Sequence, residues 1–247
     1  MKYNWNWGIF WDASPEGTGT YGELLIAGLG WTIATALCAW AIALVVGTTV
    51  GVMRTLPPHS AAARWANILG AAWVELFRNI PILVQLFLWF YVVPELLPKA
   101  WGTAIKQMPN SAFVTAVVGL GFATSARVAE QLRAGLQSLP PGQGMAASAL
   151  GLTLPQAYRH VLLPRAFRVV LPPLTSEFLN LIKNTSVGLT IGLLELTSRA
   201  RSMQEYSAQV FEAFTAATLL YLMLNLIVVT GVRALERRVS IPGQTGS

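Results

Sequence analysis

Three basic side chains lie inside long apolar stretches of this 247-residue sequence, namely Arg78, Arg127 and Lys183. A charge at the centre of a membrane costs about 2.5–3.5 kcal/mol on insertion scales, so it usually faces a bundle interior or a water-filled cavity. Three cations on three different apolar stretches would suit the passage of an anionic substrate. These residues are therefore the first candidates for a binding site.

Carboxylates near two of these cations allow a second interpretation. Glu75 precedes Arg78 by three residues and Glu130 follows Arg127 by three, so the members of each pair share a helix face. Such pairs could simply neutralise one another, or the cations could extend toward lipid headgroups. In a transport site, Glu130 would instead hold Arg127 or receive the ammonium group of a substrate. The sequence alone is compatible with both interpretations.

Polar neighbours accompany two of the three cations. Gln85 lies seven residues after Arg78, and so on a similar helix face, with the helix breaker Pro81 between them. Single Ser, Thr or Asn residues often join helices by hydrogen bonds. A run of four polar residues inside an apolar stretch favours a substrate-binding role, and that run is Lys183, Asn184, Thr185 and Ser186.

The whole chain has the composition of a membrane protein. Only 11% of its residues are charged and 54% are hydrophobic, whereas soluble domains are about 25% charged. A membrane-spanning helix needs about 20 mostly apolar residues. Polar connectors are expected at 99–110 and 195–209. Five stretches predict an all-α integral membrane protein with five transmembrane helices: 24–53, 65–97, 111–136, 166–194 and 210–235.

Prolines and glycines set the expected local geometry of these helices. Pro81 should kink the second helix, and Pro172-Pro173 should kink the fourth. Gly47 and Gly51, four residues apart in the first helix, suit a close contact with another helix. Lipid-facing small residues without a partner explain the same spacing equally well.

Segment 139–164, between the third and fourth stretches, is polar and rich in helix breakers. It predicts two short helices, near 142–150 and 154–163, with Thr153 able to cap the second and Pro155 at an early position. Prolines at both ends separate this hairpin from the neighbouring spans. A compact helical hairpin between two membrane spans suits docking to a partner protein.

The distribution of Lys and Arg predicts the orientation of the chain. The side with the hairpin and the C-terminus carries the larger set: Arg54, Arg64, Arg133, Arg159, Arg165, Arg168, Arg233, Arg237 and Arg238. The other side carries Lys2, Lys99, Lys106, Arg199 and Arg201. The positive-inside rule then places the hairpin in the cytoplasm. We expect a periplasmic or interfacial N-terminus at 1–23, one transmembrane domain at 24–238 and a cytoplasmic tail at 239–247.

Several classes of function are disfavoured. The chain has no G-x-x-x-x-G-K-[ST] phosphate loop and no Ser/His/Asp or paired-carboxylate arrangement, so we do not expect an enzyme. One cysteine and two histidines argue against a disulfide or a metal site. The net charge of +6 is not taken as a sign of nucleic-acid binding. Residues 1–23 lack the apolar core of a cleavable signal peptide, and their aromatic residues suit the membrane interface.

The hairpin resembles the cytoplasmic loop of bacterial ABC importer permeases, whose motif is E-A-A-x3-G-x9-I-x-L-P. Met145 stands where the motif has Glu, and Val161 where it has Ile. The remaining motif positions match at the same spacing, at Ala146, Ala147, Gly151, Leu163 and Pro164. The resemblance implies a type I importer permease in which these residues, with Met145, couple the chain to an ATPase.

Other stretches extend the resemblance to the polar amino acid permeases of histidine, glutamine and glutamate systems. These stretches are 75–85, 129–140 and 183–186. The N-terminal segment 4–10 and segment 126–131 look most like the glutamate/aspartate branch.

The resemblance implies a set of partners and a mechanism. A periplasmic binding protein would deliver the amino acid, and two ATP-binding subunits would drive alternating access through the hairpin. A second permease, identical or related, would complete the path within the membrane lipid of the bacterial inner membrane. The chain itself would hold no cofactor, because ATP and magnesium belong to the ATPase. Substrate contacts would come from Arg78, Gln85, Arg127, Glu130, Lys183, Asn184, Thr185 and Ser186.

Two other functions stay open at this point. An ion-coupled secondary transporter would work without an ATPase, although five spans without an inverted repeat leave the hairpin unexplained. A non-transporting assembly subunit would use its intramembrane charges only for structure, and its partner permease would carry the substrate alone.

Overall fold

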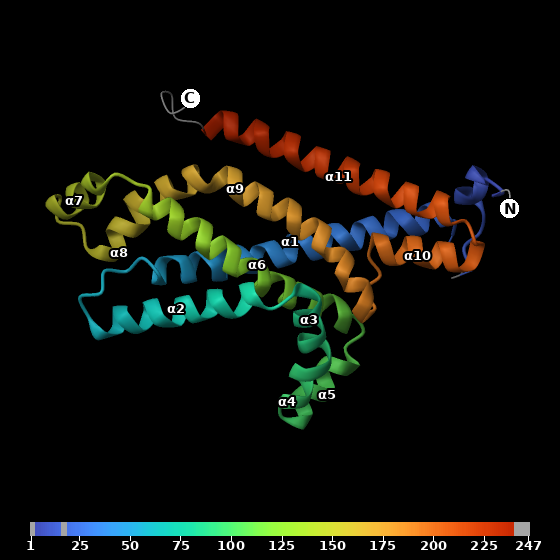
Figure 1. The fold of residues 1–247 in the computed structure, drawn as a ribbon, viewed down its shortest axis with the longest axis horizontal. Helices are drawn as coiled ribbons and strands as arrows, with labels where there is room; N and C mark the ends of the chain where they lie inside the picture. Colours follow the sequence, from blue (N-terminus) through green and yellow to red (C-terminus); the bar gives the residue numbers. More distant parts are fainter. Residues whose placement is uncertain (1–2, 16–18, 240–247) are drawn as a thin grey trace. The chain divides into compact units, whose positions relative to one another are not determined.

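The computed structural model describes residues 3–15 and 19–239, with side chains as far as residue 234 in the last helix. Within this part of the chain the regular structure is helical, apart from one isolated bridge between Ala13 and Thr20 (Figure 1). The predicted all-α class is therefore confirmed. Lys2, Arg237, Arg238 and tail residues 240–247, which bear on the predicted orientation and boundaries, fall outside the described side chains.

Long helices cover most of the predicted spans. In the described residues, three are long and apolar enough to cross a membrane: α1 (Tyr21–Met53), α6 (Ser111–Gln137) and α11 (Val210–Val239). A fourth candidate arises if α2 (Ala61–Asn79) and the helices after it are counted as one broken span. The helix α9 (Leu163–Asn184) is also long, but it carries several ionisable residues.

Two predicted spans differ from the structure in their continuity. The second is a broken helix, because α2 ends at Asn79 and Ile80 is extended with a φ of −96°. Pro81 causes this break, since it lacks an N–H and disfavours a helical conformation in the preceding residue. In contrast, α9 continues as a helix through Pro172-Pro173 and ends at Asn184.

Helices α3 (Ile82–Phe87) and α4 (Val93–Leu96) follow the break, with the π-helical turn η2 (Leu88–Val92) between them. Helix α9 is followed by the 3-10 helix η4 (Thr185–Ile191), which ends at Gly192 with a φ of 84°. The fourth span thus ends as an α-helix ten residues earlier than predicted.

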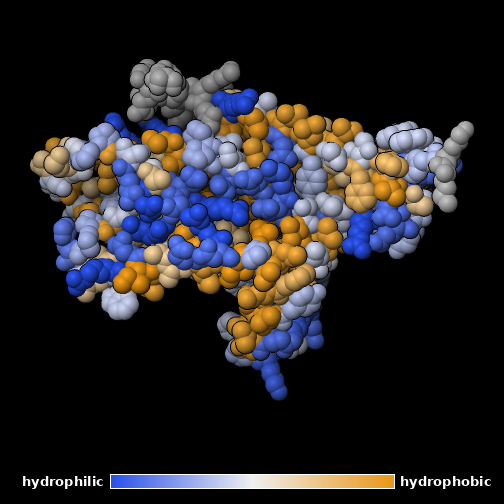
Figure 2. All heavy atoms as spheres, viewed as in Figure 1, coloured by the Kyte–Doolittle hydropathy of each residue, from blue (hydrophilic) through white to orange (hydrophobic). Residues whose placement is uncertain are grey.

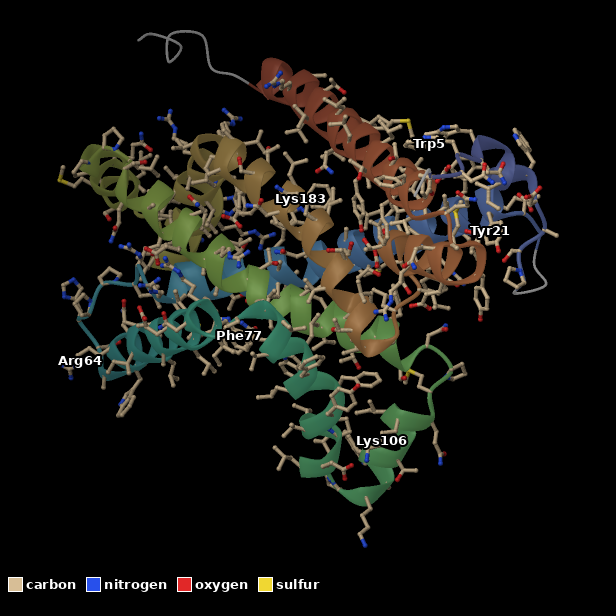
Figure 3. The ribbon with its side chains drawn as sticks, turned by 45° about the vertical axis from the view of Figure 1, so that its right-hand side comes forward. Trp5, Tyr21, Arg64, Phe77, Lys106 and Lys183 are labelled. Carbon is tan, nitrogen blue, oxygen red and sulfur yellow. The ribbon has the colours of Figure 1, made fainter. Side chains whose placement is uncertain are left out.

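Both expected connectors contain helices. Segment 99–110 includes α5 (Lys99–Gln107), whose Lys106 pairs with Glu95 of α4 (Figure 3). Segment 195–209 includes α10 (Leu196–Ser207), which buries an apolar face in a core cluster. Burial of that face stabilises a helix whose exposed side is polar. The overall polarity of these two segments therefore did not reveal that they contain helices.

The chain divides into two compact units, and each is described separately. The first comprises residues 1–40, 81–121 and 179–228. Its apolar core joins the N-terminal segment, α1, α10 and α11 through Ile9, Tyr21, Leu24, Leu25, Leu196, Ala200, Met203, Ala213 and Ala217. The 3-10 helix η1 (Trp7–Trp11) carries the exposed tryptophans Trp7 and Trp11.

The second unit comprises residues 41–80, 122–178 and 229–247. Its part of α1 packs closely on its part of α6. A Cβ on Gly47 would lie 2.6 Å from Val128 Cβ, and one on Gly51 would lie 3.0 Å from the Ala129 carbonyl oxygen. Real Cβ atoms do not approach so closely, so only glycine permits this contact at Gly47. The predicted close helix contact is confirmed.

Candidate functional site

One carboxylate in the second unit interacts with two of the predicted cations. Arg127 of α6 lies with its Nη1 atom 3.8 Å from Glu177 Oε2 of α9. Arg78 of α2 attracts the same carboxylate electrostatically. Arg127 is 38% exposed and the Glu177 side chain is 14% exposed, so the carboxylate is the more enclosed partner. Glu75 lies one helical turn before Arg78, so these two cations are accompanied by two acids.

Glu130 takes partners other than Arg127. Its carboxylate forms ion pairs with Arg54, directly after α1, and with Arg133 one turn further along α6. Arg133 also donates a hydrogen bond of 2.7 Å from Nη1 to Gln137 Oε1. The proposed pairing of Glu130 with Arg127 is therefore wrong. Residues 54 and 130 are far apart in sequence, and helix spacing could not reveal their contact.

The acid near Arg78 also has a local polar partner. Glu75 accepts a hydrogen bond of 3.0 Å from Asn79 Nδ2, one helical turn along α2. The sequence prediction that Glu75 and Arg78 share a helix face agrees with their place in one continuous helix.

The polar run 183–186, which spans the end of α9 and the start of η4, lies in the first unit. Lys183 is exposed on the last turn of α9 (Figure 3). Thr185 Oγ1 donates to the Ile182 carbonyl at 2.7 Å, and Ser186 Oγ donates to the Lys183 carbonyl at 2.7 Å. These bonds satisfy carbonyl groups that lose their α-helical partners where α9 changes to a 3-10 helix. Thr185 is fully buried, whereas the hydroxyl oxygen of the partly exposed Ser186 can still accept a hydrogen bond from a ligand.

Gln85 is buried in α3, which contacts η4 within the same unit. The structure thus brings the element that holds Gln85 against the element that holds Thr185 and Ser186. Asn184 is partly exposed at the boundary between α9 and η4. Gln85, Thr185 and Ser186 therefore lie on two neighbouring elements of the first unit.

A buried acid in the first unit was missed by the sequence analysis. The Glu195 carboxylate is fully buried and caps α10 by accepting hydrogen bonds of 2.8 Å from the Thr197 and Ser198 amides. Tyr221 of α11 donates a third hydrogen bond of 2.7 Å to Glu195 Oε2. Burial raises the pKa of Glu195 above its ordinary value. Its position just before a helix signals capping, but the tyrosine partner is distant in sequence.

The hairpin consists of α7 (Pro141–Ala149), α8 (Leu154–Ala157) and the π-helical turn η3 (Tyr158–Leu162) leading into α9. Gly151 ends the first helix region with a φ of 75°, which favours glycine. The predicted cap is confirmed, because Thr153 and Gln156 form a capping box at α8. The two predicted helices are thus present, with a π-helical turn in the second. This second helix continues directly into α9, so the predicted separation of the hairpin from the fourth span at Pro164 is wrong.

The exposed face of the hairpin differs from the one expected. Ala147 is only 2% exposed and packs inside the hairpin, so it cannot itself be a docking surface. A Cβ on Gly151 would meet open space, so its constraint is conformational rather than steric. The large exposed apolar side chains are Met145 at 67%, Leu150 at 80% and Leu154 at 48%. We call these three residues the hairpin apolar patch.

No group of three or more His, Cys, Asp and Glu side chains that could hold a metal ion occurs among the described residues.

Comparisons with known proteins bear on the whole chain. Residues 60–241 match the family described as binding-protein-dependent transport system inner membrane component. Along its full length the chain is 47% identical to the glutamate/aspartate import permease protein GltJ of Escherichia coli, covering 99% of that protein. It is 35% identical over 87% of its length to the probable glutamine ABC transporter permease protein GlnM of Bacillus subtilis, covering 93% of it.

A solved structure described as an amino acid ABC transporter with histidines is also similar. The alignment covers 88% of this chain and 95% of the other chain, with a TM-score of 0.73 and 29% sequence identity.

Proposed function

The chain belongs to the family of binding-protein-dependent transport system inner membrane components, and we propose that it transports glutamate and aspartate into the cell. It is a permease subunit of an ABC amino acid importer and not an enzyme. The observation that carries the substrate assignment is the 47% identity to a glutamate/aspartate import permease across the full chain.

We propose substrate contacts in each unit, taken separately. In the second unit, Arg78 and Arg127 would attract the side-chain carboxylate of the substrate. In the first unit, Lys183 would meet a carboxylate, and the Ser186 hydroxyl oxygen would accept a hydrogen bond from the ammonium group. The fully buried Thr185 would support the fold of this region. Gln85 and Asn184 would supply further hydrogen bonds, whereas Glu130 is occupied by Arg54 and Arg133.

We also propose that the chain crosses the membrane five times. In this arrangement α2 and the helices after Pro81 form the second span, and α9 forms the fourth. The N-terminus would lie in the periplasm and the hairpin in the cytoplasm, as the positive-inside rule predicts. Charges on α9 fit a helix that faces the transport path rather than lipid.

The hairpin is proposed to dock in the dimer of ATP-binding subunits. Its apolar patch is exposed, and the hairpin lies outside the proposed membrane spans. A partner protein, rather than lipid, would therefore bury this patch. Met145 replaces the acidic residue of the loop motif, so this copy would dock by apolar contact. ATP and magnesium would then act on the ATP-binding subunits and not on this chain.

A second permease subunit would cover an apolar surface on α3, η2 and α4. Figure 2 shows this segment as largely hydrophobic. Its exposed apolar side chains recur at helical spacing: Leu83, Val84, Phe87, Leu88, Tyr91, Val92 and Leu96. That spacing forms one continuous stripe, as expected for a helix that packs against another protein within the membrane.

Substrate competition in proteoliposomes tests this proposal. The complete transporter should accumulate labelled L-glutamate, and unlabelled L-aspartate should compete at low excess, whereas L-glutamine should compete weakly. Strong competition by glutamine together with weak competition by aspartate would contradict the acidic assignment.

A further inference from the structure

A short segment after α1 connects three other parts of the second unit. Arg54, Thr55 and Leu56 form this segment, which we call the α1 corner. Arg54 joins it to α6 through the ion pair with Glu130. The stem of Arg54 also packs on α2, because a Cβ on Gly70 would lie 2.8 Å from Arg54 Cγ.

The hairpin is joined to the same corner by one tyrosine. The Tyr158 hydroxyl donates a hydrogen bond of 2.8 Å to the Thr55 carbonyl oxygen and lies 3.2 Å from Thr55 Oγ1. Tyr158 is only 9% exposed, so water competes weakly for this bond. It occupies the first position of the π-helical turn η3, a type of irregularity that is frequent at functional sites.

The third residue of the corner is held by α2. Asn67 Nδ2 donates to the Leu56 carbonyl oxygen at 3.1 Å and to the Ala63 carbonyl oxygen at 2.8 Å. Consecutive residues of the corner are thus bound to α6, to the hairpin and to α2. A displacement of any one of these elements acts on the others through the corner.

Internal hydrogen bonds let the hairpin act as one body. The Leu152 amide donates to the Ala147 carbonyl at 3.1 Å, which closes the turn after α7. The Thr153 amide donates to Gln156 Oε1 at 2.8 Å, which fixes the start of α8. Force applied at the hairpin apolar patch therefore reaches Tyr158 with little internal deformation.

We infer that the hydrogen bond from Tyr158 to Thr55 carries displacement of the hairpin to the α1 corner, and so to α2 and α6. Tyr158 is then a positioning residue for transport, distinct from the residues that bind the ATPase. This inference rests on the proposed function, in which the hairpin docks on the ATP-binding subunits.

The test uses the complete transporter in proteoliposomes with its binding protein and L-glutamate. Two quantities are measured: the amount of ATPase that copurifies and the L-glutamate transported per ATP hydrolysed. Tyr158→Phe keeps the ring but removes the donor. It should retain the ATPase and lower transport per ATP by about two- to tenfold, the effect of one neutral hydrogen bond.

Two matched variants sharpen this result. Tyr206→Phe removes the same hydroxyl from a tyrosine of α10 that is 64% exposed, and it should leave both quantities unchanged. Thr55→Val keeps the carbonyl acceptor, so transport per ATP should stay close to that of the wild type.

Unchanged transport per ATP in Tyr158→Phe would overturn the inference. Loss of the ATPase from that variant would also overturn it, because Tyr158 would then serve docking. A wild-type chain that copurifies no ATPase would instead contradict the proposed function, and with it the inference.

Discussion

Arg127 on α6 and Glu177 on α9 approach within 3.8 Å, between Nη1 and Oε2. They are fifty residues apart in sequence, and Arg78 adds a second positive charge near the same carboxylate. This relationship places two cations near one enclosed carboxylate in the second unit, and the proposed contact with an acidic substrate rests on it.

Arg127→Gln should lower the initial rate of L-glutamate uptake by about ten- to a hundredfold, since hydrogen bonds to charged groups contribute about 1.5–3 kcal/mol. Arg201→Gln is the matched control, because Arg201 forms an exposed pair with Glu205 on α10. Uptake rates are compared at equal amounts of assembled complex. Equal uptake rates for the two variants would show that Arg127 does not contribute to substrate binding.

Gly47→Leu should disrupt the contact between α1 and α6. The contact leaves no room for a side chain, and overpacking costs about 1–3 kcal/mol. The control is Gly30→Leu on the same helix, where an added Cβ meets no atom within 4 Å. Thermal unfolding of the detergent-purified chain should show a lower Tm for Gly47→Leu only. Similar Tm values for both variants would refute the close contact.

The sequence was most informative where local chemistry decides the structure. The helix breakers and the Thr153 cap predicted the hairpin, and Gly47 and Gly51 predicted a helix contact. Local spacing could not reveal partners on distant helices. Glu130 therefore received the wrong partner, Ala147 was assigned to a surface although it is buried, and Tyr158 was overlooked. Each of these errors arose because a single sequence does not show which face of a helix packs against another helix.

Proline affected helix continuity differently at the two predicted kink positions. Pro81 and the pair Pro172-Pro173 were both expected to kink a span, but only Pro81 breaks its helix in the structure. A proline removes one hydrogen bond in either case. Whether the helix continues depends on the packing around it, which a single sequence does not record.

Glu195 should make stability depend on pH. Its pKa is raised from an ordinary value of 4.5, because burial disfavours the charged form. Its contribution to stability is thus fully present below about pH 4.5 and is lost as pH rises through the raised pKa. Glu195→Gln cannot ionise, so its Tm relative to that of the wild type should increase with pH from 4.5 upward. A Tm difference that is constant with pH would contradict this expectation.

Met145→Lys should weaken docking of the ATP-binding subunits, because it places a charge in the hairpin apolar patch. Met145 is 67% exposed, so the substitution should leave the fold of the chain intact. Met145→Leu keeps the apolar surface and should retain the ATPase. Copurification of the ATPase with each variant measures the difference. Retention of the ATPase by Met145→Lys at the wild-type level would show that the patch is not the docking surface.

The most direct test of the account is L-glutamate uptake into proteoliposomes from which single components are omitted. The complete set contains this chain, its second permease, the ATP-binding subunits, the binding protein and ATP. We predict accumulation against a gradient with the complete set, and loss of accumulation when this chain, the binding protein or ATP is left out. Accumulation by the purified chain alone, or by the complete set without this chain, would contradict the account.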